Sequence, residues 1–355
     1  MKKMKIAVIG QGRSGKDIHG KYFLSEDNQR VEVAYVIEAH EGRRKLAVKD
    51  YGCIGLTDYK ELYDKKDIDL VVNASFSQEH YQITKDLLQH GFNVLVEKPF
   101  GRTSYECMDL IQTAKEHNVI VAAFHQSLYA PSFKDIKNII QSGKLGEVFQ
   151  ISLKYSGFAR RWDWQTLQRC CAGSTFNSGP HPIGQALDLL DWDKNVKVEY
   201  CDLRTIITSG DAEDYSKIIL SAPNKPTVDI EICSVDAYSD FVFKIYGSKG
   251  TLKATNQDYE MKTVDFEKLP PKPVVFEPLM DENFAPLYCE ETLPIKEEKG
   301  KFNGSSFDTA VKEFYEMLYD TIMLGKPLAI SPEMAMEVIR VIEICHAQKP
   351  LPVKY

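Results

Sequence analysis

The chain has 355 residues, 43% of them hydrophobic, and a formal net charge of −7, which suits an ordinary globular protein long enough for two domains. The acidic balance argues against nucleic-acid binding, and no apolar run is long enough for a signal peptide or a membrane-spanning helix. Without such a run we expect no membrane association and a cytoplasmic location. The eight cysteines show no Cys-x-x-Cys spacing, so we expect reduced thiols and no metal site.

Short β-branched runs alternate with helical periods over residues 4–123. Such alternation predicts an α/β fold with a doubly wound parallel sheet. Helices are expected at Gln78–His90 and Ser104–His117. The predicted strands are Ile6–Ile9, Val31–Ile37, Leu70–Val72, Val94–Val96 and Val119–Ala123.

From Val148 onward, period-2 segments dominate and predict an open-faced, mostly antiparallel sheet, interrupted by a helix at Pro182–Leu190. We therefore expect one domain over residues 1–125 and an α+β domain over residues 126–355, whose last helices can pack back on the first domain. The predicted strands are Phe149–Tyr155, Val196–Thr208, Tyr215–Ser221, Val228–Val235, Phe241–Tyr246 and Thr251–Ala254.

A long loop is expected at about Thr255–Asn303, because Pro270, Pro271 and Pro273 stand close together there and a charged run follows at Lys296–Lys301. Two helices close the chain, at Ser305–Leu324 and Pro332–Ala347. The second has a serine and a proline at its start.

A G-x-G-x-x-G sequence at Gly10–Gly15 follows the first predicted strand directly. Its glycines permit a tight turn and let backbone amides approach a pyrophosphate, and the following helix adds its positive end. The position between a strand and a helix is the one this mechanism requires. The loop therefore predicts a dinucleotide-binding Rossmann domain, with contacts from Gly10, Gly12, Arg13, Ser14 and Gly15.

Glu38 stands at the end of the second strand, 23 residues after Gly15. A carboxylate there can accept hydrogen bonds from the adenine ribose and would repel a 2′-phosphate, which favours NAD over NADP. Arg43 and Arg44 follow closely and could instead bind a phosphate, although both also suit the surface of a helix.

Two further segments carry groups suited to proton transfer. Glu97-Lys98-Pro99 ends the strand Val94–Val96, at the edge of a parallel sheet where ligands bind, and proline directs the lysine backbone away from helix. His181 ends the segment Gly173–His181; a histidine titrates near neutrality and can take a hydroxyl proton while hydride leaves the same carbon. Each group taken alone is also common as a structural residue.

Together these residues resemble the glucose–fructose oxidoreductase and inositol dehydrogenase family, written Gfo/Idh/MocA, over nearly the whole chain. The segments Val94–Gly101, Ser142–Val148 and Tyr246–Thr251 and the closing helix pair carry the resemblance. It implies Lys98 as the catalytic lysine, His181 as the general acid/base, and a homodimer or homotetramer. The expected cofactor contacts beyond the glycine loop are Glu38, Ala74, Ser75, Glu97 and Lys98.

The chain departs from the family pattern at several positions around His181. Asn177 stands where an aspartate is common four residues before the histidine, and Gly184 where another is common three residues after it. Cys171-Ala172 replaces a glycine pair, and Leu128 replaces an arginine. An asparagine can hold the histidine by a hydrogen bond but cannot act as a carboxylate base, so Asn177 is expected in the catalytic group with a modified role.

An aromatic and charged segment precedes the histidine segment. Tryptophan faces stack on sugar rings, and Arg or Asp binds hydroxyls or an acidic group; a packed structural loop is the alternative. The expected substrate contacts are Arg160, Arg161, Trp162, Asp163 and Trp164.

The expected activity is NAD(P)-dependent hydride transfer between nicotinamide and a secondary hydroxyl carbon of a sugar, glycoside or cyclitol. Two alternatives from other classes remain: an NAD-dependent glycoside hydrolase that oxidises its substrate transiently, and a non-catalytic regulator that senses a dinucleotide. Net accumulation of NADH separates the first alternative, and the absence of any turnover would indicate the second.

Overall fold

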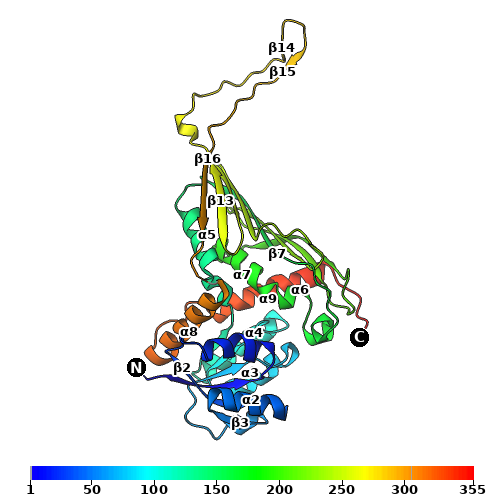
Figure 1. The fold of residues 1–355 in the computed structure, drawn as a ribbon. Coiled ribbons are helices and arrows are strands. Elements are labelled where there is room, and N and C mark those ends of the chain that lie inside the picture. Colours follow the sequence, from blue (N-terminus) through cyan, green and yellow to red (C-terminus); the bar gives the residue numbers. More distant parts are fainter. Residues whose placement is uncertain (1, 305) are drawn as a thin grey trace.

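The structure, a computed structural model, describes residues 2–304 and 306–355. The sheet of the N-terminal half lies at the bottom of Figure 1. It has six parallel strands, in the order β3-β2-β1-β4-β5-β6. This is the strand order of a dinucleotide-binding sheet. The strands are β1 Met4–Ile9, β2 Val31–Ile37, β3 Ile54–Leu56, β4 Leu70–Asn73, β5 Val94–Val96 and β6 Val121–Ala123.

Both faces of this sheet are buried, because successive side chains of a strand point to opposite faces. In β1, Ile6 and Val8 belong to one core layer, whereas Ala7 and Ile9 belong to the other. The predicted doubly wound parallel sheet is confirmed. The covering helices are the π-helix η1 Arg13–Gly20, α1 Lys21–Phe23, α2 Glu41–Tyr51, α3 His80–Gln89 and α4 Ser104–Glu116, with short 3₁₀ turns at η2 Tyr59–Leu62 and η3 Ser77–Glu79.

The two closing helices connect the halves of the chain. Helix α8 (Ser306–Leu324) packs on the first sheet, where Phe314, Tyr315 and Leu318 join the core layer of Ile6 and Val8. Helix α9 (Pro332–Gln348) lies against both α4 and the β8 end of the second sheet. The predicted start of the first closing helix at Ser305 lies outside the described residues.

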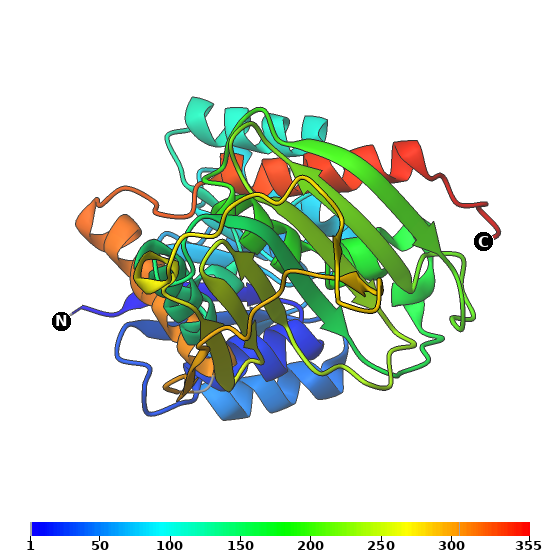
Figure 2. The ribbon, with the colours of Figure 1, turned by 90° about the horizontal axis from the view of Figure 1, so that it is seen from above.

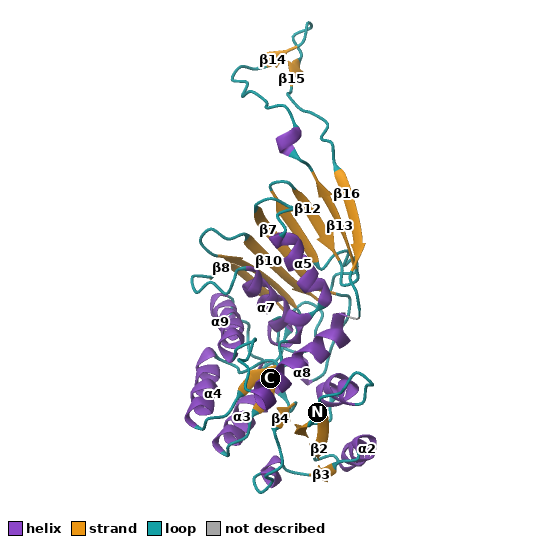
Figure 3. Ribbon diagram, turned by 90° about the vertical axis from the view of Figure 1, so that its left-hand side faces the viewer, coloured by secondary structure: helices purple, strands orange, loops and turns teal. Residues whose placement is uncertain are grey.

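Eight strands form the second sheet, in the order β16-β13-β12-β11-β7-β10-β9-β8, and every neighbouring pair is antiparallel except β7 and β10. Helices lie on one face only (Figure 3), and from above the strands lie across those helices (Figure 2). The predicted open-faced, mostly antiparallel sheet is confirmed. Its strands are β7 Val148–Ser156, β8 Lys197–Arg204, β9 Tyr215–Ser221, β10 Thr227–Cys233, β11 Phe243–Gly247, β12 Gly250–Ala254, β13 Asp258–Thr263 and β16 Lys296–Lys301.

The helices beneath the second sheet bring the histidine segment towards the first domain. They are α5 Pro131–Gln141, α6 Ser174–Asn177 and α7 Pro180–Leu189, with 3₁₀ turns η4 Gln126–Tyr129, η5 Trp164–Thr166 and η6 Gln168–Cys170. Each of α5 and α7 has a proline in its first turn, where the missing N–H costs no hydrogen bond. None of the described helices is long and apolar enough to span a bilayer.

The expectation of a loop over residues 255–303 is wrong at both ends, where β13 and β16 extend the sheet. The charged run is the edge strand itself, held by cross-strand pairs: Lys262 with Glu297 at 2.7 Å, and Lys299 with Glu260 at 2.7 Å. A strand is usually recognised by alternating apolar residues. At this edge both faces contact solvent, so the strand carries charged residues and shows no apolar alternation. The three-residue strand β3 was also missed; it contains a glycine and is too short to show a period.

Between these two strands, residues 264–295 form an arm that projects away from the body of the protein (Figure 1). It holds one 3₁₀ turn, η7 Phe266–Lys268, and one small pair of strands, β14 Leu279–Met280 and β15 Pro286–Leu287. Several large apolar side chains on the arm are almost fully exposed, among them Phe276, Phe284 and Tyr288.

Candidate active site

The glycine loop leaves room for a ligand at one position and packs tightly at two others. Gly10 has φ +86°, and a Cβ on it would lie 2.5 Å from the carbonyl oxygen of Ala74. A Cβ on Gly15 would collide with the carbonyl oxygen of Gly10, whereas a Cβ on Gly12 would meet nothing within 4 Å. The open side of Gly12, next to the start of η1 at Arg13, fits a pyrophosphate approached by backbone amides.

Glu38 lies beside the glycine loop, on the side where the adenine ribose is expected. Its Oε2 accepts a hydrogen bond from the Gln11 amide at 2.9 Å, and its Oε1 accepts one from the His40 amide at 2.9 Å. Arg44 donates to the carbonyl oxygen of Glu38 at 2.6 Å, and Arg43 is exposed. The carboxylate therefore stands beside the loop, and the nearer arginine already has a backbone partner.

Ala74 and Ser75 follow β4, the strand beside β1 where the strand order reverses. The Ser75 hydroxyl donates to Asn73 Oδ1 at 2.7 Å, and the carbonyl oxygen of Ser75 contacts His80 Nε2 at 3.2 Å. The two residues thus line the carboxyl edge of the sheet next to the glycine loop, as expected for this fold.

The buried side chain of Glu97 contacts His19 and the backbone of Lys98. Its Oε1 lies 3.1 Å from His19 Nε2, and its Oε2 accepts a hydrogen bond from the Lys98 amide at 3.0 Å. The other ring nitrogen of His19, Nδ1, lies 2.7 Å from the Tyr315 hydroxyl on α8. Burial raises the pKa of Glu97, but the hydrogen bond with His19 and the charge of Lys98 outweigh burial and lower that pKa to about 2. The carboxylate is therefore ionised at neutral pH.

Lys98 reaches from the first domain to the second. Its Nζ donates to the main-chain carbonyl oxygen of Asn177 at 2.7 Å and lies 3.4 Å from Asn177 Oδ1. Burial lowers the pKa of Lys98, Glu97 opposes that effect, and the charges of Arg13 and Arg161 add to the lowering. The amine is thus held in a site that disfavours its charge, which is a feature of proton-transfer groups.

His181 lies in the first turn of α7, and its Nδ1 is 3.2 Å from Ser127 Oγ. Its ring stacks at 6.5 Å on that of Tyr155 from β7. Burial, followed by the charges of Lys98 and His125, lowers the pKa of His181 to about 3. The imidazole is therefore neutral at neutral pH.

Asn177 does not hold His181, contrary to the sequence expectation. Its side-chain oxygen lies near Lys98 and 3.5 Å from Gln165 Nε2, and the structure gives Ser127 as the hydrogen-bond partner of His181 in the described chain. The reason is that α6 ends at Asn177 and α7 begins at Pro180, so the four-residue spacing does not place the two side chains on one helix face.

Sequence reasoning missed one buried imidazole whose charge acts on His181. His125 follows β6, is 2% exposed, and has a pKa lowered to about 4 by burial, with a further lowering from Lys98 that Glu97 opposes. A Cβ on Gly184 would lie 3.5 Å from His125 Nδ1, so the absence of a side chain at residue 184 leaves space beside this ring. A histidine at the carboxyl end of a parallel strand was the signal that could have identified it.

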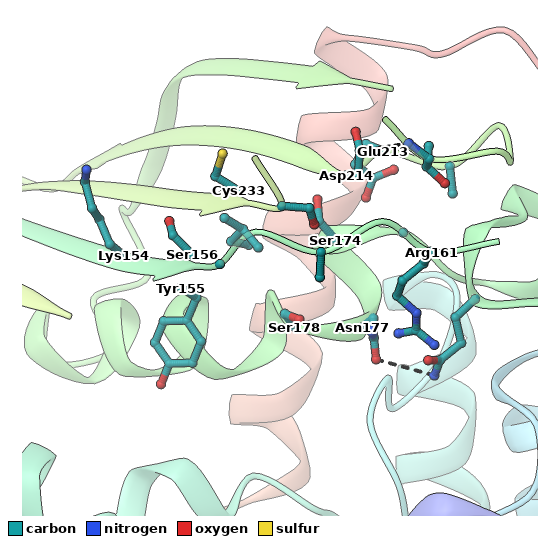
Figure 4. Close-up of a pocket in the computed structure, with 18 of the residues that line it drawn as sticks. Lys154, Tyr155, Ser156, Arg161, Ser174, Asn177, Ser178, Glu213, Asp214 and Cys233 are labelled. Atoms are coloured by element: carbon teal, nitrogen blue, oxygen red, sulfur yellow. Dashed lines mark hydrogen bonds between the residues drawn. The ribbon is translucent and has the colours of Figure 1, made fainter. Parts of the chain in front are cut away.

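A pocket of about 490 Å³ opens beside Asn177, at the end of the second sheet where β7 and β10 end and β9 begins (Figure 4). Lys98 and His181 are not among the residues that line it; Lys98 is connected to it through its contact with Asn177. A volume of this size accommodates a small organic ligand. Asn177 and Ser178 line it from the histidine segment, and Arg161 from the preceding loop. The wall contributed by the sheet and its loops includes Lys154, Tyr155, Ser156, Glu213, Asp214 and Cys233.

Of the five expected substrate contacts, Arg161 lines this pocket and the other four are not among its lining residues. Asp163 forms a two-pronged ion pair with Arg161, at 2.8 to 3.0 Å. Arg160 donates to the carbonyl oxygen of Ile207 at 2.9 Å. Trp162 is 77% exposed, and Trp164 packs edge-on against the ring of Phe76.

Comparison with known proteins matches both halves of the chain to one family. Residues 4–125 match the model described as an oxidoreductase family with an NAD-binding Rossmann fold, and residues 133–253 match the GFO/IDH/MocA C-terminal domain. The chain is 24% identical to the uncharacterized oxidoreductase YhhX of Escherichia coli (strain K12) over 95% of this chain and 94% of that protein. It is 25% identical to the scyllo-inositol 2-dehydrogenase (NADP(+)) IolW of Bacillus subtilis (strain 168) over 54% and 53% of the two chains.

Solved structures share the fold over almost the full length. An NAD-binding protein from Listeria innocua superposes with a TM-score of 0.79 at 20% identity, covering 98% of each chain. GenD2 from gentamicin A biosynthesis, solved in complex with NAD, superposes with a TM-score of 0.77 at 17% identity, covering 98% of this chain and 94% of that one. With matching domain models over both halves, the chain belongs to the GFO/IDH/MocA family of oxidoreductases and carries its NAD-binding Rossmann domain.

Proposed function

We propose that the protein is an NAD-dependent dehydrogenase that oxidises a secondary hydroxyl of a sugar, glycoside or cyclitol. The observation that carries this proposal is the contact of Lys98, from the first domain, with Asn177, which lines the pocket of the second domain. A substrate in that pocket would lie next to a lysine of lowered pKa, at the carboxyl edge where the glycine loop fits a dinucleotide.

Each residue of the site has a separate role in the proposed reaction. Lys98 donates a hydrogen bond to the reacting oxygen and stabilises negative charge that develops there. Neutral His181 accepts the hydroxyl proton, and Ser127 fixes its ring through Nδ1. Glu97 holds the Lys98 backbone. NAD held at the glycine loop would supply the hydride acceptor for the same carbon, so that the alcohol would lose two electrons and two hydrogens in total.

NAD is proposed over NADP because the Glu38 carboxylate stands beside the loop and Arg44 is engaged by the backbone. The IolW relative carries NADP(+) in its name, so the preference requires measurement. Calorimetric titration of both cofactors tests it directly.

The activity is tested by incubating the protein with NAD and a panel of sugars, glycosides and cyclitols, and by following the absorbance of NADH. Net NADH formation supports a dehydrogenase. Release of an aglycone without net NADH would instead indicate hydrolysis through transient oxidation, and cofactor binding without any turnover would indicate a sensor.

We also propose that the protein assembles as a homodimer or homotetramer through the face of the second sheet that carries no helix (Figure 3). The face is polar: Lys217 pairs with Asp229 at 2.7 Å, and Lys154 pairs with Glu231 at 3.4 Å. Light scattering coupled to size-exclusion chromatography measures the mass, and a monomer at micromolar concentration would refute this proposal.

A further inference from the structure

A buried line of hydrogen bonds leads from helix α8 to the backbone of Lys98. The Tyr315 hydroxyl lies 2.7 Å from His19 Nδ1, and His19 Nε2 lies 3.1 Å from Glu97 Oε1. The other carboxylate oxygen of Glu97 accepts a hydrogen bond from the Lys98 amide at 3.0 Å. Tyr315 and His19 are 0% exposed and Glu97 is 3% exposed, so these side chains contact one another away from water.

The direction of these hydrogen bonds follows from the groups that form them. Burial raises the pKa of Tyr315 well above the usual tyrosine value, so its hydroxyl keeps its proton and donates to His19 Nδ1. A neutral imidazole that accepts at Nδ1 carries its proton on Nε2, and Nε2 faces the ionised carboxylate of Glu97. Tyr315 thus fixes the tautomer in which His19 donates to Glu97.

Glu97 in turn supports the charge of Lys98. Burial lowers the pKa of Lys98, Glu97 opposes this effect, and the charges of Arg13 and Arg161 add to the lowering. A carboxylate as deeply buried as Glu97 needs a donor to stay ionised and aligned. Without the donor at Oε1, Lys98 would therefore lose the support of its acidic neighbour.

Several charged and titratable groups surround this pair, and one of them holds the carboxylate. In the described chain, His19 is the side chain that hydrogen-bonds Glu97. The ring nitrogens of His80 instead lie 2.8 Å and 3.2 Å from the carbonyl oxygens of Pro99 and Ser75. The groups that act electrostatically on Glu97 or Lys98 are Arg13 and His19 on η1, His80 at the start of α3, His125 after β6, Arg161 before η5, His181 on α7 and Tyr315 on α8.

We propose that His19, oriented by Tyr315, is a positioning residue that keeps the Glu97 carboxylate in place and so keeps Lys98 able to donate to the reacting oxygen. His19 lies on η1, which begins at Arg13 beside the open side of Gly12. The segment that fits the cofactor pyrophosphate therefore also supports the lysine. This inference rests on the proposed function, since it assigns a role in the reaction proposed for Lys98.

The test measures the pKa of Lys98 without turnover. NMR titration of the full chain, labelled with ¹³C at lysine Cε, follows the Lys98 signal, which is assigned by its loss in Lys98→Met. In His19→Phe, which keeps a ring but removes both nitrogens, the pKa of Lys98 should fall by about 1 or more, the scale of one nearby opposite charge. His19→Gln keeps an amide that can donate to Glu97 and should restore most of the loss. An unchanged or raised pKa of Lys98 in His19→Phe would overturn the proposal.

Tyr315→Phe and two controls separate this role from simple packing. Tyr315→Phe removes the donor that fixes the His19 tautomer and should lower the pKa of Lys98 by a smaller amount. Tyr22→Phe removes a buried hydroxyl without a partner in the described chain, from a ring stacked on Tyr315 at 5.0 Å, and should leave that pKa unchanged. His117→Phe, at the exposed end of α4, should also leave it unchanged.

Melting temperature and NAD affinity show whether each variant keeps the fold and the glycine loop. If His19→Phe does not fold, Tyr315→Phe decides the question, and an unmoved pKa of Lys98 in that variant refutes the role of the line from α8. An equal fall in Tyr22→Phe would show that packing alone acts on Lys98 and would refute it too.

Failure of this inference and failure of the proposed function give different results. If NADH forms with a polyol but His19→Phe leaves the pKa of Lys98 unmoved, the positioning role is wrong and the dehydrogenase stands. If that pKa falls but no sugar, glycoside or cyclitol yields NADH, the dehydrogenase is wrong and the link from His19 to Lys98 stands. With a substrate, the alkaline limb of kcat/KM should move downward in His19→Phe and return in His19→Gln, because the Lys98 ammonium then loses its proton at lower pH.

Discussion

Lys98 Nζ lies 2.7 Å from the main-chain carbonyl oxygen of Asn177, so a lysine at the edge of the parallel sheet is held by the segment that leads into His181. The contact crosses from one half of the chain to the other. It uses the backbone of Asn177, so replacing this side chain changes the electrostatics around the lysine while its main-chain acceptor remains.

Lys98→Met should lower kcat by a factor on the order of 100 or more, because it removes the group that we propose donates to the reacting oxygen. NAD affinity should change much less. Steady-state kinetics on the best substrate of the polyol panel, with calorimetric titration of NAD, measures both. Near-normal turnover would show that Lys98 has no part in the chemistry.

His181→Ala should lower kcat on a similar scale, and in the unmutated protein the pH profile should show the state of this imidazole. Since the pKa of His181 is lowered to about 3, kcat/KM for oxidation should show no acidic limb near the usual histidine pKa of about 6.5. A pH–rate series on the unmutated protein is the measurement. An acidic limb at the usual histidine pKa would contradict the lowered pKa of His181.

The same shift has a consequence for stability. The unfolded chain binds a proton at His181 near the usual pKa of about 6.5, whereas the folded chain does so only near pH 3. The unfolded state therefore binds more protons in this window, and the free energy of unfolding falls as the pH drops from about 6.5 to about 3. Denaturant unfolding at several pH values should give a shallower acid loss in His181→Ala than in the unmutated protein.

Asn177→Asp should raise the pKa of Lys98, because it brings a carboxylate to a position 3.4 Å from Nζ. The alkaline limb of the pH profile for kcat/KM should move upward, since in the proposed reaction the Lys98 ammonium donates to the reacting oxygen. Asn138→Asp, the same change on an exposed position of α5, is the control. A shift confined to the acidic limb would mean that residue 177 acts on His181 instead.

Glu38→Ala should weaken NAD binding more than NADP binding and so narrow the preference between them. Both affinities should fall somewhat, because Glu38 Oε2 also accepts the hydrogen bond of the Gln11 amide in the loop. Titration of both cofactors against both proteins is the measurement. Tighter NADP binding by the unmutated protein would refute the assignment of NAD.

Tyr315→Phe should lower the free energy of unfolding by about 1 kcal/mol or more, since it leaves the buried His19 ring without its hydroxyl partner. The matched control is Tyr22→Phe. Tyr22 stacks on Tyr315 at 5.0 Å, but its buried hydroxyl has no partner in the described chain. Its removal should be neutral or slightly stabilising, and equal losses in both variants would show that the His19 contact contributes nothing specific.

Local patterns in the sequence determined much of this protein. The strand followed by Gly10–Gly15 predicts a dinucleotide-binding domain because only glycine fits the close approaches to Ala74 and to the loop's own backbone. Alternating apolar residues predict most strands of the second sheet. Those signals are strong because each depends on neighbouring residues alone.

Tertiary structure decided the rest. The edge strand Lys296–Lys301 has no apolar period and exists because its charges pair with β13. The break between α6 and α7 directs Asn177 to Lys98 rather than to His181. Likewise His125 and Ser127 act on His181 from the segment that follows β6. Their roles depend on burial and on partners distant in the sequence, which no local pattern records.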